Sequence, residues 1–261
     1  MVDAALLDKR LLRAAFEKAT PGYDAAAVLQ HEVCRRMLSR LEFVKLQPAA
    51  MLDAGCGTGN AVPALRARFP RAAIYALDIA AAMVRRACAR LPWWQRLAGR
   101  DVMPVCADIE RLPLRAAAVD FAWSNLALQW VNDAPCALGE LRRVLAPGGL
   151  LMFSTLGPDT LKELRAAYLG ADRYTHVNRF IDMHDLGDML VGAGFADPVM
   201  DMECITLTYA DARALMRDLK AIGAHNVTAG RRQGMTARAL LATVERNYEQ
   251  FRCDGRLPAT F

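Results

Sequence analysis

Apolar residues in this chain follow two alternating patterns: short runs of about six positions, and longer segments with helical spacing. The short runs predict five strands, at 49–53, 73–78, 102–107, 119–124 and 150–155. Between them, segments such as 80–91 and 134–145 repeat apolar residues every three or four positions, which predicts amphipathic helices. This alternation predicts βαβ units and an α/β fold with a doubly wound, mostly parallel sheet.

The segments on either side of this alternating region have a different pattern. Two amino-terminal helices are predicted, at 6–18 and 24–41, with a stop signal at Thr20-Pro21-Gly22 between them. After Gly157, helices are predicted at 160–169, 186–194, 211–223 and 236–252, with a sixth strand at 200–209. The predicted domains are a helical cap at 1–44, a core at 45–156 and a helical lobe at 157–261 that includes the sixth strand.

The first predicted strand ends at Asp53 and leads into a turn with glycines at alternate positions, Gly55, Gly57 and Gly59. Glycine adopts backbone angles that a Cβ forbids, and it lets a ligand approach the main chain closely. The acid before the turn would repel a phosphate but would accept hydrogen bonds from an ammonium group. The chain also lacks the G-x-x-x-x-G-K-[ST] phosphate loop. The turn therefore indicates S-adenosylmethionine (SAM), whose methionine end carries an ammonium group.

Acids close three successive predicted strands, at Asp53, Asp78 and Asp108. The carboxyl ends of parallel strands lie side by side, so these carboxylates are expected to line one crevice. Asp53 would face the amino group of SAM, and Asp78, 25 residues later, would accept both ribose hydroxyls. Asp108, with the backbone N–H of Ile109, would meet the adenine amino edge. Strand-end acids can also simply cap the following helices, but three in register behind this turn favour a cofactor site.

The composition of the chain indicates the compartment and the kinds of partner to expect. No apolar run is long enough to span a bilayer, and residues 1–13 lack a signal-peptide core, which predicts a cytoplasmic protein with no membrane partner. Seven scattered cysteines without a CxxC pair are expected to be free thiols in a reducing compartment. The net charge of +5 comes mostly from clusters of arginine. These clusters either lie on solvent-exposed helix faces or bind an acidic partner. No aromatic-interleaved basic stripe appears, so nucleic acid is not an expected partner.

Over residues 45–156 the chain resembles class I SAM-dependent methyltransferases, which have a Rossmann-like core. The glycine motif matches 53–59, the ribose-binding acid matches Asp78, the adenine-side pair matches Asp108-Ile109, and Leu-Ala-Pro-Gly-Gly at 145–149 is a further match. The expected SAM-binding residues are Asp53, Gly55, Cys56, Gly57, Gly59, Asp78, Ile79, Met83, Asp108, Ile109, Asn125 and Leu126. The product would be S-adenosylhomocysteine, and no metal is expected.

The segment that follows the fourth strand reads Ser-Asn-Leu-Ala-Leu-Gln-Trp at 124–130, and in such enzymes this segment contacts the acceptor. It lacks the Asn/Asp-Pro-Pro-Tyr/Phe motif of enzymes that methylate amide or exocyclic nitrogens. No His/Asp dyad or metal-spaced cluster is evident, and His176 and His184 are interpreted as isolated structural or exposed residues. An acceptor that needs no general base is therefore favoured, such as a carboxylate that is ionised at pH 7.

Nearly the whole chain also resembles the malonyl-acyl carrier protein O-methyltransferase family, which starts biotin synthesis. The resemblance lies in 22–30, 124–130, 153–164, 176–187 and 218–226, including Leu-Lys-Ala-Ile-Gly-Ala. It implies methylation of the free carboxyl group of a malonyl thioester carried by an acidic acyl carrier protein. The expected substrate- or carrier-binding residues are Gln129, Trp130, Arg217, Lys220, Arg231 and Arg232. Tyr23 is expected to order SAM or the acceptor carboxylate, or else to be a packing residue.

Two alternatives stay open from the sequence. One is a related methyltransferase for another small acceptor, such as a quinone precursor or another carboxylate. The other is an assembly factor that keeps the SAM fold only as a binding module.

The family that this chain resembles usually ends with an antiparallel strand, which is inserted between the fifth and sixth strands. This chain stops at Pro258–Phe261, about where that strand would begin, so the final strand is expected to be absent.

Overall fold

The computed structural model describes residues 6–92, 102–172, 174–224, 226–228, 230–231 and 238–261. Within them, five parallel strands form one sheet in the order β3-β2-β1-β4-β5. The strands are β1 (Ala50–Ala54), β2 (Ala73–Asp78), β3 (Val102–Cys106), β4 (Val119–Asn125) and β5 (Leu145–Ser154). The predicted doubly wound α/β fold is confirmed.

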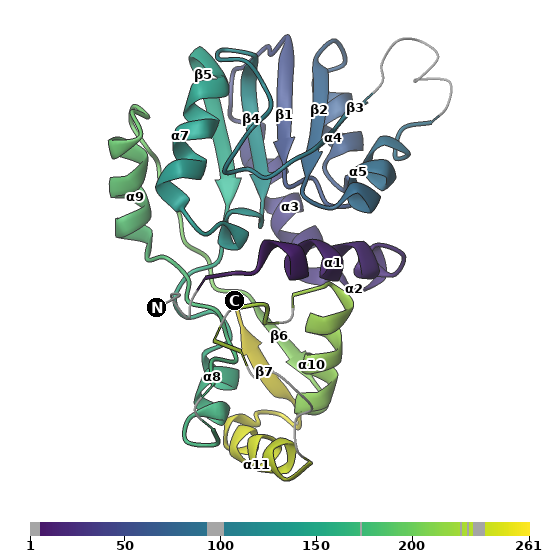
Figure 1. The fold of residues 1–261 in the computed structure, drawn as a ribbon, viewed down its shortest axis with the longest axis vertical. Coiled ribbons are helices and arrows are strands. Elements are labelled where there is room, and N and C mark those ends of the chain that lie inside the picture. The colour runs from purple at the N-terminus through teal and green to yellow at the C-terminus, as the bar shows by residue number, and fades with distance from the viewer. Residues whose placement is uncertain (1–5, 93–101, 173, 225, 229, 232–237) are drawn as a thin grey trace.

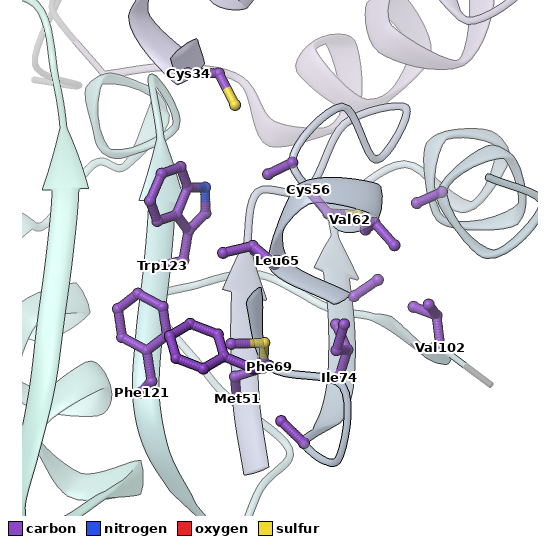
Figure 2. Close-up of a cluster of buried hydrophobic side chains, with 14 of the residues drawn as sticks. Cys34, Met51, Cys56, Val62, Leu65, Phe69, Ile74, Val102, Phe121 and Trp123 are labelled. Atoms are coloured by element: carbon purple, nitrogen blue, oxygen red, sulfur yellow. The ribbon is translucent and has the colours of Figure 1, made fainter. Parts of the chain in front are cut away.

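Helices cover both faces of this sheet. They are α3 (Val28–Leu41), α4 (Val62–Arg68) and α5 (Ala81–Cys88) on one face, and α7 (Ala134–Val144) and α9 (Met183–Gly192) on the other. Successive residues of a strand point to opposite faces, so Met51 belongs to the first apolar cluster and Leu52 to the second. Figure 2 shows the first cluster, in which Phe121 and Trp123 from β4 lie beside Phe69 and Met51.

The structure differs from the predicted elements at two places near the site. The predicted helix at 24–41 is broken at Ala27, whose ψ of 43° is not helical, into α2 (Tyr23–Ala26) and α3. The sequence Ala-Pro-Gly-Gly at 146–149 is typical of a helix end followed by a loop, but here β5 already begins at Leu145. Pairing between Val119 and Leu145 is followed by an irregularity before Phe121 pairs with Leu150. Tertiary pairing with β4 therefore overrides the Pro-Gly-Gly signal.

The carboxyl-terminal lobe has a sheet of its own. The predicted sixth strand forms as β6 (Thr206–Tyr209), but it pairs antiparallel with β7 (Leu257–Thr260) and does not join the parallel sheet. The large sheet has no antiparallel member among the described residues, yet the last residues of the chain do form a strand. The buried Glu163 carboxylate fixes this strand by accepting a 3.1 Å hydrogen bond from the backbone N–H of Thr260. The helices of the lobe are α8 (Lys162–Tyr168), α10 (Ala212–Ala221) and α11 (Arg238–Tyr248).

The helix α1 (Lys9–Ala19) crosses the carboxyl ends of the five parallel strands, and the carboxyl-terminal lobe lies on its other side (Figure 1). Asp8 caps α1 by accepting hydrogen bonds from the backbone N–H groups of Arg10 and Leu11. Gly223 packs against α1 so closely that a Cβ there would lie 3.0 Å from the Phe16 ring. The strand ends are therefore covered by α1 and the lobe. No helix in the described part of the chain is long and apolar enough to cross a membrane.

Candidate active site

The glycine turn after β1 uses its three glycines in different ways. A Cβ at Gly55, where φ is 77°, would lie 2.2 Å from the Cβ of Ala127. A Cβ at Gly59, where φ is 79°, would lie 2.6 Å from the Cα of Ala87 in α5. Gly57 donates its backbone N–H to Asp78 over 3.0 Å. Gly55 and Gly57 line a cavity at the strand ends, whereas Gly59 serves the close packing of α5.

The acids at the ends of β1 and β2 are close enough to affect each other. Asp53 is 3% exposed, and its Oδ2 has no hydrogen-bond partner among the described residues. Burial, and then the Asp78 carboxylate, raise the pKa of Asp53 to about 7. Burial also raises the pKa of Asp78 to about 6, although the N–H groups of Ala80 and Gly57 oppose this rise. This pair is suited to a ligand that brings positive charge or hydrogen-bond donors.

Asp108, which follows β3, is already bound by a cation from another element. The Nζ of Lys9 lies 3.0 Å from its Oδ2, contacts Glu110, and donates to the backbone oxygen of Trp130 over 3.1 Å. Asp108 and Ile109 both line the cavity at the strand ends. The three acids were expected to line one crevice, but only Asp78 and Asp108 line this cavity, whereas Asp53 is buried and does not. Asp108 is paired with Lys9 of α1.

Most of the predicted SAM-binding residues line this cavity, which we call the donor cavity. They are Gly55, Gly57, Asp78, Ile79, Met83, Asp108, Ile109, Asn125 and Leu126. Asp53, Cys56 and Gly59 do not line it. The Cys56 side chain is buried in the apolar cluster of Figure 2. Leu126 has a left-handed φ of 49°, and its backbone N–H donates to Ser154, which fixes the loop after β4.

Three polar residues of α1 fasten this helix over the donor cavity, and sequence reasoning missed them. Lys9 binds Asp108, Arg13 donates to the backbone oxygen of Ile79 over 2.9 Å, and Glu17 accepts from the backbone N–H of Ala82. Their i, i+4, i+8 spacing places them on one face of the helix. That spacing shows that the three residues share one face of the helix, but it does not say what this face contacts.

A second, larger cavity of about 260 Å³ lies between the core and the carboxyl-terminal lobe, and we call it the acceptor cavity. The two cavities share four lining residues, namely Phe16, Tyr23, Leu126 and Trp130. Gln129 lines the acceptor cavity only. The predicted acceptor segment after β4 therefore lies at the junction of the two cavities.

Tyr23 lies at this junction because its neighbour Asp24 is fixed to the glycine turn. Asp24 accepts a 2.6 Å hydrogen bond from Arg90 and another from the hydroxyl of Thr58. A Cβ at Gly57 would be 4.0 Å from the Tyr23 ring. Burial, then Asp78 and Asp24, raise the pKa of Tyr23 well above its usual value, so the phenol keeps its proton at neutral pH. The catalytic role predicted for Tyr23 stays a prediction.

The interpretation of His176 as an isolated residue is wrong. Its Nε2 lies 2.7 Å from Oδ1 of Asp172, and its ring stacks on Tyr168 with centroids 3.7 Å apart. His176 lines the acceptor cavity. The four-residue spacing to Asp172 was visible, but only the fold around α8 brings the pair to a cavity. His184 is exposed as expected, but it is not isolated either, because its Nδ1 lies 3.0 Å from Oδ1 of Asp182.

The predicted carrier-binding cations fall into different settings. Arg217 and Lys220 are exposed on α10, and neither has an ion-pair partner among the described residues. Arg231 is partly buried and donates to the backbone oxygen of Thr228 over 3.1 Å. Arg232 lies outside the described residues. Within the described part of the chain, no group of three or more His, Cys, Asp or Glu residues could hold a metal.

Comparisons with solved structures agree with the fold. A protein crystallised with the Haloferax volcanii Trm112 methyltransferase activator has a TM-score of 0.55 and 20% identity, over 70% of this chain and 75% of that one. The Bacillus subtilis YcgJ protein has a TM-score of 0.57 and 15% identity, over 88% of this chain and 94% of that one. Residues 52–153 match the family model described as a methyltransferase domain. Fold, cavity and match together define a class I SAM-dependent methyltransferase.

Curated relatives narrow this class further. The chain is 59% identical to a Gallionella capsiferriformans protein, over 98% of this chain and 89% of the relative. It is 57% identical to a protein from Methylovorus sp., over 99% of this chain and 88% of the relative. It is 54% identical to a protein from Laribacter hongkongensis, over 100% of this chain and 89% of the relative. All three are named malonyl-[acyl-carrier protein] O-methyltransferase. The chain belongs to the malonyl-[acyl-carrier protein] O-methyltransferase family.

Proposed function

We propose that this enzyme transfers a methyl group from SAM to the free carboxylate of malonyl-acyl carrier protein, which gives the malonyl methyl ester. The observation that carries the proposal is the identity of 54–59% to relatives of that name over nearly the full chain. The two adjoining cavities support it, because an acceptor in one would meet a donor in the other at Tyr23, Leu126 and Trp130.

The described residues fit SAM. Asp53 does not line the donor cavity, so its unpartnered Oδ2 would reach the ammonium group of the methionine end through water. Asp78 is held in place by two backbone N–H groups and keeps lone pairs for the ribose hydroxyls. Ile109 and Met83 offer apolar contacts to the adenine ring. When bound, SAM supplies a methyl group on a positively charged sulfur.

The reaction needs positioning and exclusion of water rather than proton transfer. A carboxylate oxygen of the acceptor forms the O–CH₃ bond while the S–CH₃ bond breaks, and the bonding electron pair stays on sulfur. A negative and a positive charge are thereby neutralised, and no proton moves. Phe16, Leu126 and Trp130 form an apolar wall around the junction of the cavities, where loss of water favours such charge neutralisation.

The carrier protein is proposed to dock on α10. Met216, Asp218 and Leu219 of this helix line the acceptor cavity, while Arg217 and Lys220 are exposed to solvent. Acyl carrier proteins are acidic, so cations on this helix would hold the carrier where its acyl arm reaches the cavity. The partial burial of Arg231 and its bond to Thr228 leave it less available for docking.

The test is a methyl-transfer assay that offers malonyl-acyl carrier protein, malonyl-CoA and free malonate in parallel. Malonyl thioesters should be methylated at the carboxyl group, with the carrier-bound form preferred. Methylation of a quinone precursor or another carboxylate instead would assign the enzyme to another acceptor. Failure to bind SAM in calorimetry would favour the assembly-factor alternative.

Charge reversal separates carrier docking from catalysis. The double variant Arg217→Glu, Lys220→Glu should lose about tenfold in kcat/KM on malonyl-acyl carrier protein and much less on malonyl-CoA. The matched control is Arg71→Glu, Arg115→Glu, which makes the same charge change at exposed residues that precede β2 and β4, at the opposite end of the sheet. Equal losses on both substrates would contradict carrier docking on α10.

A further inference from the structure

The acceptor cavity contains a histidine–aspartate pair that the mechanism above does not use. His176 is the only Lys, Arg or His among the described residues that line this cavity. The remaining lining is largely apolar or neutral, and its only acidic side chain, Asp218, accepts a 2.8 Å hydrogen bond from the Tyr209 hydroxyl. A carboxylate that enters an apolar cavity needs a partner of opposite charge, because an unpaired buried charge is costly.

His176 is oriented by two neighbours at once. Asp172 binds its Nε2 at 2.7 Å, and Tyr168 stacks on its ring at an interplanar angle of 11°. The side chains of His176 and Asp172 are 17% and 12% exposed. Asp172 fixes the ring through the contact at Nε2, and Tyr168 fixes its plane by stacking on its face. The ring is thus fixed at the cavity wall.

This arrangement leaves one nitrogen for a ligand. When both ring nitrogens of a histidine carry protons it has two N–H donors, and with Asp172 at Nε2 the donor at Nδ1 would be left for a carboxylate. No described residue binds Nδ1. Four other lining residues also have buried polar oxygens without a partner among the described residues, namely Gln30, Gln129, Thr160 and Asn178. The wall around His176 therefore has unused hydrogen-bonding capacity, which is typical of a binding site.

We propose that His176, held by Asp172 and Tyr168, recognises the carboxylate of the acyl substrate through Nδ1–H. This rests on the proposed function for the identity of the substrate. One carboxylate oxygen accepts the hydrogen bond, and the other stays free to attack the methyl group. His176 is thus a specificity-determining residue that distinguishes a charged malonyl group from its uncharged acetyl counterpart. The methyl ester lacks this charge, so the product binds more weakly than the substrate.

The experiment measures binding, so that it does not depend on turnover. Malonyl-CoA and acetyl-CoA are titrated by calorimetry into the protein saturated with S-adenosylhomocysteine. The wild type should prefer malonyl-CoA, and His176→Asn should reduce that preference about tenfold, with acetyl-CoA binding and SAM affinity unchanged. Asp172→Asn should shift the preference in the same direction while it keeps the size of the side chain. His184→Asn is the matched control, because His184 also pairs with an aspartate, at 3.0 Å, but is 87% exposed.

The outcomes separate this inference from the proposed function. An unchanged malonyl preference in both variants, with thermal midpoints like that of the wild type, would overturn the role of His176. A parallel loss of SAM affinity or folding in both would show a structural role and would also overturn it. A wild type that prefers malonyl-CoA in binding but methylates no malonyl thioester would refute the proposed function, while the loss of preference in His176→Asn would still support carboxylate recognition.

Discussion

Lys9 and Asp108 are 99 residues apart in the chain, yet the Nζ of Lys9 lies 3.0 Å from Oδ2 of Asp108. The same ammonium group also contacts Glu110. Lys9 begins α1, and Asp108 follows β3 and lines the donor cavity. The ion pair therefore holds the first helix closed over the site predicted to bind SAM.

Loss of this contact should weaken SAM binding. Lys9→Met keeps the apolar part of the side chain but removes the charge, so α1 should open more often and SAM should dissociate faster. We expect a rise of about fivefold in the Kd of SAM, equivalent to about 1 kcal/mol, measured by calorimetry and stopped-flow dissociation. Arg10→Met, on an exposed position of the same helix, should change little. If the two variants behaved alike, α1 would not act as a cover.

Tyr23→Phe tests the phenol at the junction of the cavities. The raised pKa keeps this hydroxyl protonated, so it can donate a hydrogen bond to either ligand. Its loss should reduce kcat/KM by about tenfold, because one donor at a reacting centre contributes about 1–2 kcal/mol. Steady-state kinetics and SAM calorimetry would separate the two ligands. If neither SAM affinity nor turnover changed, Tyr23 would be only a packing residue.

Asp53 should make the ligand-free protein less stable as pH rises. Its pKa is about 7 in the folded protein against 3.8 ordinarily, so the folded state binds more protons between those values. The free energy of unfolding therefore falls across that window. Asp53→Asn has no carboxyl group to ionise, so its free energy of unfolding should not fall in this way. The difference in free energy of unfolding between the variant and the wild type should therefore shift in favour of the variant by about 2 kcal/mol from pH 5 to pH 7.5. Urea unfolding at the two pH values measures this change.

The same substitution should weaken SAM binding, because a neutral amide cannot pair with the ammonium group. Asp188→Asn, at an exposed position of α9, serves as the control for both measurements. A stability difference between Asp53→Asn and the wild type that did not vary with pH would mean that Asp53 ionises as readily when folded as when unfolded. Stronger SAM binding by the variant would contradict the assignment of Asp53 to the ammonium group.

Gly59→Ala should destabilise the fold. The added Cβ would lie 2.6 Å from the Cα of Ala87, and φ of +79° strains any other residue. We expect a loss of about 2–3 kcal/mol in the free energy of unfolding, measured by urea denaturation. Gly139→Ala is the matched control, because it lies in α7 with no atom within 4 Å of the new Cβ. It should be neutral or stabilising by about 1 kcal/mol. Similar effects in the two variants would contradict the close packing at Gly59.

The sequence alone determined the sheet and the donor edge. The strands β2 and β3 start where predicted, and the glycine turn and the three acids fall at the carboxyl ends of β1, β2 and β3. These features are local, since alternation, turn residues and strand ends are encoded within a few positions. Once the sheet is parallel, its geometry brings the acids together without further information.

Only the tertiary structure decided which of these residues face the cavities and what covers them. Cys56 and Gly59 belong to the motif but do not line the donor cavity, because Cys56 packs in the apolar core and Gly59 packs against Ala87 of α5. Just before the break at Ala27, Asp24 contacts Thr58 and Arg90, which are 34 and 66 residues away. No local periodicity encodes such contacts.

The acceptor side depended on tertiary structure most of all. The pairing of β6 with β7 joins residues about 50 positions apart, and it closes the lobe that forms one wall of the acceptor cavity. His176 and Asp172 are near each other in sequence, but only the fold places His176 at the wall of that cavity. The sequence by itself thus determined the donor, through a motif confined to one turn and three strand ends. The acceptor cavity was decided by long-range packing, because its wall is built from segments at both ends of the chain.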